Sequence, residues 1–170
     1  MDAYERRNYA TALSEWRPLA EEGNAQAQLH LGLLYANGDG VPKDYTKARQ
    51  WYEKAAAQGY VMAQYSLGLL YDNGDGVPQD YTVARQWYEK AAARGYAMAQ
   101  TNLGVLYAHG QGVPQDDVWA YMWYSLAAER STDPRDTDAA DRRDNVARRM
   151  TSAQVAKAQK LAREWTPNIP

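Results

Sequence analysis

The stretch at residues 25–60 reads AQAQLHLGLLYANGDGVPKDYTKARQWYEKAAAQGY, and it decides the fold because it is repeated at once. Residues 61–96 read VMAQYSLGLLYDNGDGVPQDYTVARQWYEKAAARGY and differ from the first copy at only eight of 36 positions. A third copy begins at residue 97 with AMAQTNLGVLYAHGQGVPQD and then drifts. Self-similarity at a fixed period of this length is the signature of a stacked repeat architecture. We therefore predict repeats at 25–60, 61–96 and 97–132.

Each copy predicts two helices joined by a loop. The first helix of the first copy carries an apolar stripe at helical spacing, formed by Ala27, Leu31, Leu34 and Tyr35. Gly32 lies within this stripe, where a missing side chain would let the partner helix approach closely. Asn37-Gly38 predicts the end of the helix, since glycine tolerates the left-handed backbone of a C-terminal cap. Asp44 is well placed to cap the second helix, whose own stripe is Ala48, Tyr52 and Ala55.

A helix pair of this size cannot bury its own apolar face, so neighbouring pairs must stack. The predicted fold class is all-α, with helix pairs stacked into an α-α superhelix, or solenoid. Aromatic pairs recur at one position of the repeat, and we interpret them as core and inter-repeat packing rather than as binding residues. These pairs are Trp51/Tyr52, Trp87/Tyr88 and Trp123/Tyr124.

The two ends depart from the repeat. Residues 133–170 predict a capping helix pair, with helices at 142–150 and 152–165 after a charged, proline-broken loop at 129–138. Thr151 and Gln154 have the spacing of a capping box, and the last helix carries a narrow apolar stripe of Val155, Ala158, Ala162 and Trp165.

The repeat pattern resembles that of a known family. It is carried in the first copy by Ala27, Leu31, Gly32, Tyr35, Gly38, Gly40, Val41, Asp44, Tyr45, Ala48, Trp51, Tyr52, Lys54, Ala55, Ala56 and Gly59. This pattern is similar to the Sel1-like repeat, a bacterial relative of the tetratricopeptide repeat, over about residues 25–128. The resemblance implies a right-handed superhelical scaffold for protein–protein contacts, often in envelope biogenesis, secretion or signalling.

Residues 1–24 resemble the middle of a tetratricopeptide unit, so we interpret them as a truncated half-repeat. Its second helix is predicted to run through Leu13, Trp16, Leu19 and Ala20 to Gly23. A solenoid that begins in mid-repeat favours an upstream leader that has been removed. The predicted compartment is therefore periplasmic or extracellular with such a leader and cytoplasmic without one. The shortened edge is also a candidate homodimer surface.

Composition argues against several classes of partner. The 170 residues include 45% hydrophobic side chains, and the formal net charge of −2 offers no basic face for nucleic acid. No stretch approaches the roughly 18 consecutive apolar residues of a membrane-spanning helix. Cysteine is absent from the sequence, which removes disulfides, thiolate nucleophiles and cysteine-based zinc sites. We predict neither nucleic-acid binding nor membrane insertion.

Residues suited to catalysis are few. His30 and His109 are the only histidines of the sequence, and they occupy different positions in non-adjacent repeats, where we expect exposed helix residues. The loop at 72–76 superficially suggests a calcium loop, but Tyr71 and Thr82 stand where the calcium spacing needs acidic ligands. We therefore predict no catalytic, cofactor-binding or metal-binding residues, and a protein that is not an enzyme.

The copies serve as an internal alignment that locates a candidate binding surface. The first helix varies at positions 25, 26, 29, 30, 36 and 37, and conservatively at 33; positions 26, 30, 33 and 37 share one face. The resemblance points to much the same surface, as a concave groove. The predicted partner-binding groove consists of Gln26, Leu29, His30, Leu33, Asn37, Met62, Tyr65, Ser66, Leu69, Asp72, Asn73, Met98, Thr101, Asn102, Val105 and His109. The alternative is that several of these side chains lie under the neighbouring repeat.

The functional hypothesis is a scaffold or adaptor whose groove binds a segment of another protein. An inhibitor or immunity-type protein that blocks a partner enzyme is the alternative. A cell-wall-related hydrolase is less favoured, because the relatives linked to that chemistry depend on cysteines that this sequence lacks.

Overall fold

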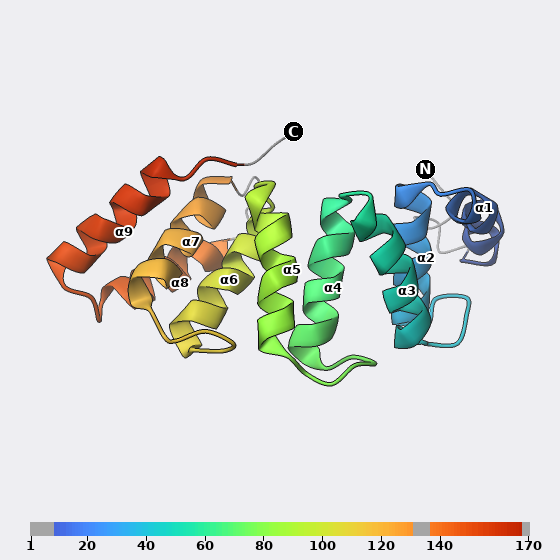
Figure 1. Ribbon diagram of the computed structural model, residues 1–170, viewed down its shortest axis with the longest axis horizontal. Coiled ribbons are helices and arrows are strands. Elements are labelled where there is room, and N and C mark those ends of the chain that lie inside the picture. The colour runs from blue at the N-terminus through green and yellow to red at the C-terminus, as the bar shows by residue number, and fades with distance from the viewer. Residues whose placement is uncertain (1–8, 131–136, 168–170) are drawn as a thin grey trace. The chain divides into compact units, whose positions relative to one another are not determined.

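The computed structural model describes residues 9–130 and 137–167, which form nine α-helices and no strand (Figure 1). The prediction of an all-α repeat fold is confirmed. The chain divides into two compact units, Met1–Gln79 and Asp80–Pro170. The first unit holds α1 (Tyr9–Glu21), α2 (Ala25–Asn37), α3 (Tyr45–Ala57) and α4 (Val61–Asn73). The second holds α5 (Tyr81–Ala93), α6 (Ala97–His109), α7 (Asp117–Arg130), α8 (Thr137–Ala147) and α9 (Ser152–Glu164).

The predicted stop and start signals set the boundaries of α2 and α3. Helix α2 ends at Gly38, whose φ of 80° is the left-handed conformation that glycine adopts without strain. Asp44 then caps α3, since its side chain accepts a hydrogen bond from the backbone N–H of Lys47 at 3.0 Å. This hydrogen bond lowers the pKa of the Asp44 carboxyl below its ordinary value. The predicted helix end at Gly38 and the predicted cap at Asp44 are both confirmed.

The core of the first unit forms where α1 packs on α2, α2 on α3, and α3 on α4. Gly32 of α2 faces the Tyr52 ring of α3 so closely that a Cβ atom there would overlap the ring. Leu19 departs from the pattern expected of α1, because 46% of its surface is exposed. The buried residues of the α1–α2 layer are Ala12, Trp16, Ala20, Ala27, Leu31 and Leu34.

In the recurring aromatic pairs all three tyrosines and Trp123 are buried, whereas the tryptophans of the first two copies are more accessible. The tyrosines are buried in every copy, as predicted: Tyr52, Tyr88 and Tyr124. Trp51 and Trp87 are only half-buried, and the ammonium groups of Lys54 and Lys90 lie 4.1 and 3.9 Å from the centres of their rings. Such cation–π contacts cover the open faces of the two indoles.

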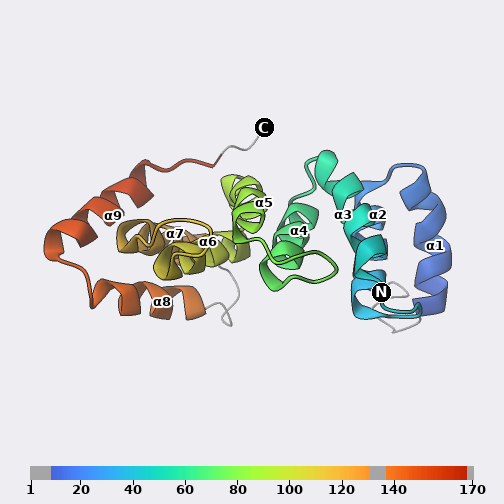
Figure 2. The ribbon, with the colours of Figure 1, turned by 60° about the horizontal axis from the view of Figure 1, so that its bottom comes forward.

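The second unit is organised around α7, which packs against α6, α8 and α9 (Figure 2). The predicted terminal helices exist, but they flank α7 and each packs on it. This arrangement buries α7 from Val118 to Ala127, with Trp119 the exposed exception at 39%. Trp119 in turn stacks on Tyr107 of α6, with 6.0 Å between the ring centres.

The predicted boundaries at this end need correction. Helix α8 begins at Thr137, five residues before the predicted start at Arg142, and an ion pair between Asp138 and Arg142 at 2.7 Å adds a small stabilisation to its first turn. Of the predicted loop at 129–138, Glu129 and Arg130 complete α7 and the last two residues begin α8. The capping box of Thr151 and Gln154 at the start of α9 is confirmed. Residues 1–8 and 131–136 lie outside the described residues.

Replacing Gly32 with alanine tests the close approach of α2 and α3. Alanine normally stabilises a helix interior by about 1 kcal/mol relative to glycine. Here the added methyl group must displace the Tyr52 ring, and overpacking of this kind costs about 1–3 kcal/mol. We expect the Gly32→Ala variant to melt at a lower temperature by circular dichroism, while Gln26→Ala on the exposed face of the same helix changes the melting temperature little. An increased melting temperature of Gly32→Ala would show that the contact is not close.

The Asp44 cap predicts a component of acid sensitivity. Because the folded pKa of Asp44 is lowered, its stabilisation is present above its ordinary pKa of 3.8 and is lost as the pH falls through the folded value. In the Asp44→Asn variant, the amide oxygen would still accept the capping hydrogen bond, but the side chain does not titrate. We expect this variant to lose less thermal stability than the wild type between pH 7 and pH 2. Equal losses would assign the acid sensitivity to other carboxyl groups.

Candidate partner-binding groove

A pocket of about 240 Å³ lies in the first unit between α2 and α4, the first helices of two successive repeats. Its floor is largely apolar, and its rim carries amide, hydroxyl and charged groups. Five of the predicted groove residues line it: Leu33, Asn37, Ser66, Leu69 and Asn73. The other lining residues are Ala36, Lys43, Tyr45, Tyr52, Leu70 and Asp75. Within this pocket, apolar and hydrogen-bonding groups line the same space, a combination that is common in ligand-binding pockets.

Two asparagine amides stand at equivalent places on the pocket rim. Asn37 ends α2 and donates a hydrogen bond from Nδ2 to Asp39 Oδ2 at 3.1 Å. Asn73 ends α4 and donates in the same way to Asp75 Oδ2 at 3.3 Å. Each carboxylate therefore orients an amide that still has an acceptor oxygen and a second N–H.

Lys43 supplies a cation to this rim. Its Nζ lies 4.6 Å from the centre of the Tyr45 ring. A side-chain hydrogen bond to Tyr45 raises the pKa of Lys43 above its ordinary value; desolvation opposes this effect, and the negative charge of Asp75 adds to it. The ammonium group is therefore charged at neutral pH and lies within electrostatic reach of Asp75.

Lys43, Tyr45 and Asp75 were missed by the sequence prediction, which compared the copies only along the first helix. The signal was available for Lys43, because the other two copies hold Gln79 and Gln115 at its position. Gln79 Nε2 donates to the carbonyl oxygen of Asp72 at 2.6 Å, and Gln115 Nε2 donates to that of Ala108 at 3.0 Å. These glutamines bind the end of their own first helix, whereas Lys43 lies over the Tyr45 ring and lines the pocket together with Asp75.

The predicted residues at the other end of α2 differ in accessibility. Leu29 is only 2% exposed, so the expectation of a groove position is wrong there and the alternative of burial holds. His30 is not a simple exposed residue either, because its ring stacks on Trp16 with 4.2 Å between the centres. Gln26 is exposed. The partner-accessible part of α2 is therefore smaller than the repeat comparison predicted.

Helix α4 presents the larger share of the predicted surface. Met62 is 45% exposed, and its carbonyl oxygen accepts a hydrogen bond from Ser66 Oγ at 2.9 Å. Tyr65 and Asp72 are half-buried. The exposed thioether of Met62 extends the apolar surface along the helix that carries Leu69.

The predicted residues of the third copy lie on α6 in the second unit. Met98 is 45% exposed and accepts a hydrogen bond at Sδ from the Tyr96 hydroxyl at 3.4 Å. Thr101 Oγ1 donates to the Ala97 carbonyl oxygen, and Val105 packs against the core of this unit. Asn102 is half-buried, and the exposed His109 places Nδ1 2.9 Å from the Val105 carbonyl oxygen.

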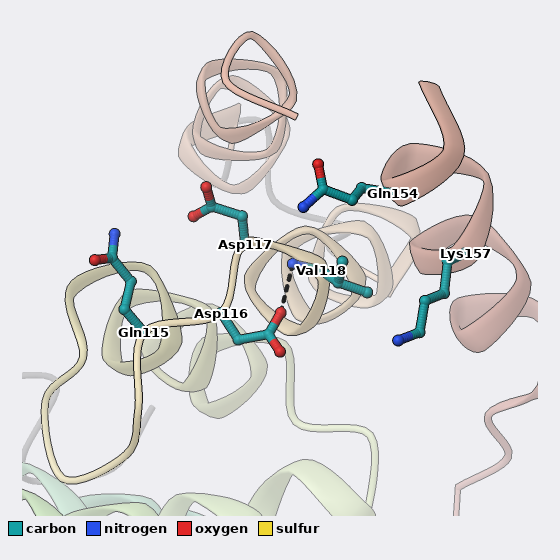
Figure 3. A pocket seen from close by; sticks show the side chains of 6 residues that line it. All are labelled: Gln115, Asp116, Asp117, Val118, Gln154 and Lys157. Atoms are coloured by element: carbon teal, nitrogen blue, oxygen red, sulfur yellow. Dashed lines mark hydrogen bonds between the residues drawn. The ribbon is translucent and has the colours of Figure 1, made fainter. Parts of the chain in front are cut away.

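A second, more polar pocket of about 590 Å³ opens at the start of α7 (Figure 3). Gln154 and Lys157 of α9 stand beside Val118, whose backbone N–H donates to Asp116 Oδ1 at 2.8 Å. Asp117 is held by Arg149 through two hydrogen bonds of 2.6 and 2.7 Å. Because these carboxylates already serve the helix cap and an ion pair, we assign this pocket to the packing of α9 on α7.

Within residues 9–130 and 137–167, no group of three or more histidine, cysteine, aspartate or glutamate side chains could hold a metal ion. No helix in these ranges has both the length and the apolar character needed to cross a membrane. The described part of the chain is an all-α repeat protein, and five of its predicted site residues meet in a groove between first helices.

The chain belongs to the Sel1 repeat family. The family model described as Sel1 repeat matches residues 25–60, 61–96 and 97–131. Sel1 repeats generally mediate protein–protein interactions, and the proteins that carry them are typically non-catalytic scaffolds.

Two solved structures show the same fold. One is a protective antigen present in uropathogenic Escherichia coli strains that displays an SLR fold; it has 50% sequence identity, a TM-score of 0.67, and a match covering 69% of this chain and 25% of that chain. The other is a Sel1 repeat protein from Oxalobacter formigenes, with 36% identity, a TM-score of 0.73, and a match covering 81% of this chain and 53% of that one. The match thus spans about a quarter and about half of these two proteins. The comparison with curated proteins found no match.

Exchanging Lys43 for the residue of the other two copies tests how the rim is built. In the Lys43→Gln variant, the new amide can bind the end of α2 as Gln79 and Gln115 bind the ends of α4 and α6. One added hydrogen bond contributes about 0.5–1.5 kcal/mol. We expect a higher melting temperature for Lys43→Gln, and a lower one for the reverse exchange Gln115→Lys. A stabilising Gln115→Lys would contradict the assigned role of these glutamines.

Proposed function

We propose that this protein is a non-enzymatic interaction scaffold that binds a segment of a partner protein in the groove between α2 and α4. The observation that supports this proposal most directly is the pocket in which Leu33 and Leu69 meet the amides of Asn37 and Asn73. An apolar side chain of the partner would enter the pocket. Its main chain would lie along the rim, where the two amides can donate and accept hydrogen bonds.

The expected contributions to the binding free energy favour a partner segment that also contacts residues outside this pocket. Burying one large aliphatic side chain contributes about 1.5–3 kcal/mol. Hydrogen bonds to the two amides would add about 0.5–1.5 kcal/mol each. Losing translational freedom and ordering the segment cost several kcal/mol, so this pocket alone gives weak binding. Further contacts along α4 are available at Met62, whose flexible thioether adapts to partners of different shape.

A charge placed in the pocket should abolish binding without unfolding the helices. We expect Leu69→Glu to reduce capture of the partner from a lysate of the source organism at least tenfold, because the partner's apolar side chain would then meet a carboxylate. Capture is measured by affinity purification and quantitative mass spectrometry against the wild type.

The matched control is Gln50→Glu, which adds the same charge at an exposed position of α3 and should leave capture unchanged. Circular dichroism must show the same helical content in all three proteins. A partner that is captured equally by Leu69→Glu and the wild type would place binding elsewhere on the chain.

A further inference from the structure

The charges around the α2–α4 pocket are unevenly distributed. Asp75 lines the pocket directly, and Asp39 is one hydrogen bond removed from it through Asn37. Among the described residues that line the pocket, Lys43 is the only cation. The rim therefore carries two carboxylates and one ammonium group.

The backbones of the two helices add negative electrostatic potential at the pocket. Asn37 and Asn73 are the last residues of α2 and α4 and both line the pocket, so the C-terminal ends of both helices lie beside it. The aligned peptide dipoles place a partial negative charge of about half an electron at each such end. The rim is therefore negative overall, even with Lys43 charged.

Lys43 does not make the pocket a carboxylate site. Its ammonium group already contacts the Tyr45 ring and lies near Asp75, which together raise its pKa. A carboxylate entering the pocket would have to compete with Asp75 for Lys43 while approaching two helix C-termini. A cation would meet favourable potential from both carboxylates and both helix ends.

We infer that the pocket recognises an extended protein segment in which an apolar side chain is accompanied by a neighbouring lysine or arginine. This inference rests on the proposed function and specifies its ligand. The apolar side chain contacts Leu33, Leu69 and Leu70, while the cation lies at the rim beside Asp75. Such pairing of an apolar pocket with charge complementarity supplies both affinity and selectivity between segments.

The repeats themselves provide conservative variants for the experiment. Position 75 corresponds to Gln111 in the third copy, so Asp75→Gln removes the rim charge with a residue that the repeat already uses. The new amide oxygen can still accept the hydrogen bond from Asn73. Position 43 corresponds to Gln79 and Gln115, so Lys43→Gln removes the opposing charge in the same way.

The probe is a phage-displayed library of random twelve-residue peptides, selected on the full chain and counter-selected on Leu69→Gln, which removes the apolar side chain without adding a charge. We expect the selected peptides to be enriched in an apolar residue next to lysine or arginine. Synthetic peptides of the enriched sequence are then titrated by fluorescence anisotropy, together with a version in which norleucine replaces the basic residue.

Opposite effects of the two charge variants are expected. Asp75→Gln should weaken binding of the basic peptide about two- to fivefold, and Lys43→Gln should strengthen it by a similar factor, as expected for single exposed ion pairs. The norleucine peptide should bind both variants and the wild type alike. A merely structural effect of either substitution would change the affinity of both peptides together. Binding of the basic peptide should also weaken with added salt.

The possible results distinguish a failure of the inferred preference for basic residues from a failure of the proposed binding function. Peptides that require Leu69 but are enriched in aspartate or glutamate would overturn the inference and leave the groove function standing. Peptides that require Leu69 but show no charge preference, or equal effects of both variants on both peptides, would do the same. A library that yields no Leu69-dependent peptide would contradict the proposed function, and the inference with it.

Discussion

The contact between a glycine of the first helix and a tyrosine of the second sets the geometry of the repeat. Gly32 leaves no room for a Cβ atom against the Tyr52 ring, and Gly104 stands in the same relation to Tyr124, with its would-be Cβ 2.5 Å from Cε1. Each tyrosine is buried, so moving its ring aside would disturb the packed core, and the small glycine lets the two helices of a pair lie at close range. The opposite face of the first helix is thereby turned away from its partner, toward the groove.

Buried amides link one repeat to the next. Gln28 Nε2 donates to the Ala20 carbonyl oxygen at 3.0 Å, and Gln100 Nε2 donates to the Ala92 carbonyl oxygen at 3.3 Å. Both glutamines are at most 4% exposed, and they join the start of a first helix to the end of the preceding second helix. A buried amide is costly unless it is paired, so these bonds favour one register between neighbouring helices. The scaffold beneath the groove is therefore specified by polar as well as apolar contacts.

Other positions of the first helix make neither the glycine–tyrosine contact nor the buried glutamine hydrogen bonds. The differences between copies occur at these positions. In the first unit they combine an apolar pocket with the amides that end α2 and α4, and the loops that follow these helices add charged groups. In the second unit α8 and α9 both pack on α7, which is buried from Val118 to Ala127 except at Trp119. One repeated backbone thus forms the candidate pocket in the first unit and carries two further helices in the second.

The sequence by itself determined the repeat, the helices, the caps at Gly38 and Asp44, and the packing role of Gly32, because these follow from local periodicity and backbone preference. It also indicated a set of candidate groove positions on the first helix, and five of them line the pocket. Only the tertiary structure decided that Leu29 is buried, that His30 stacks on Trp16, and that Lys43 lines one pocket with Asp75, 32 positions later in the chain. These features depend on which side chains of neighbouring repeats meet, and spacing along one helix does not contain that information. The same reason explains the terminal helices, whose existence was predictable but whose shared packing on α7 was not.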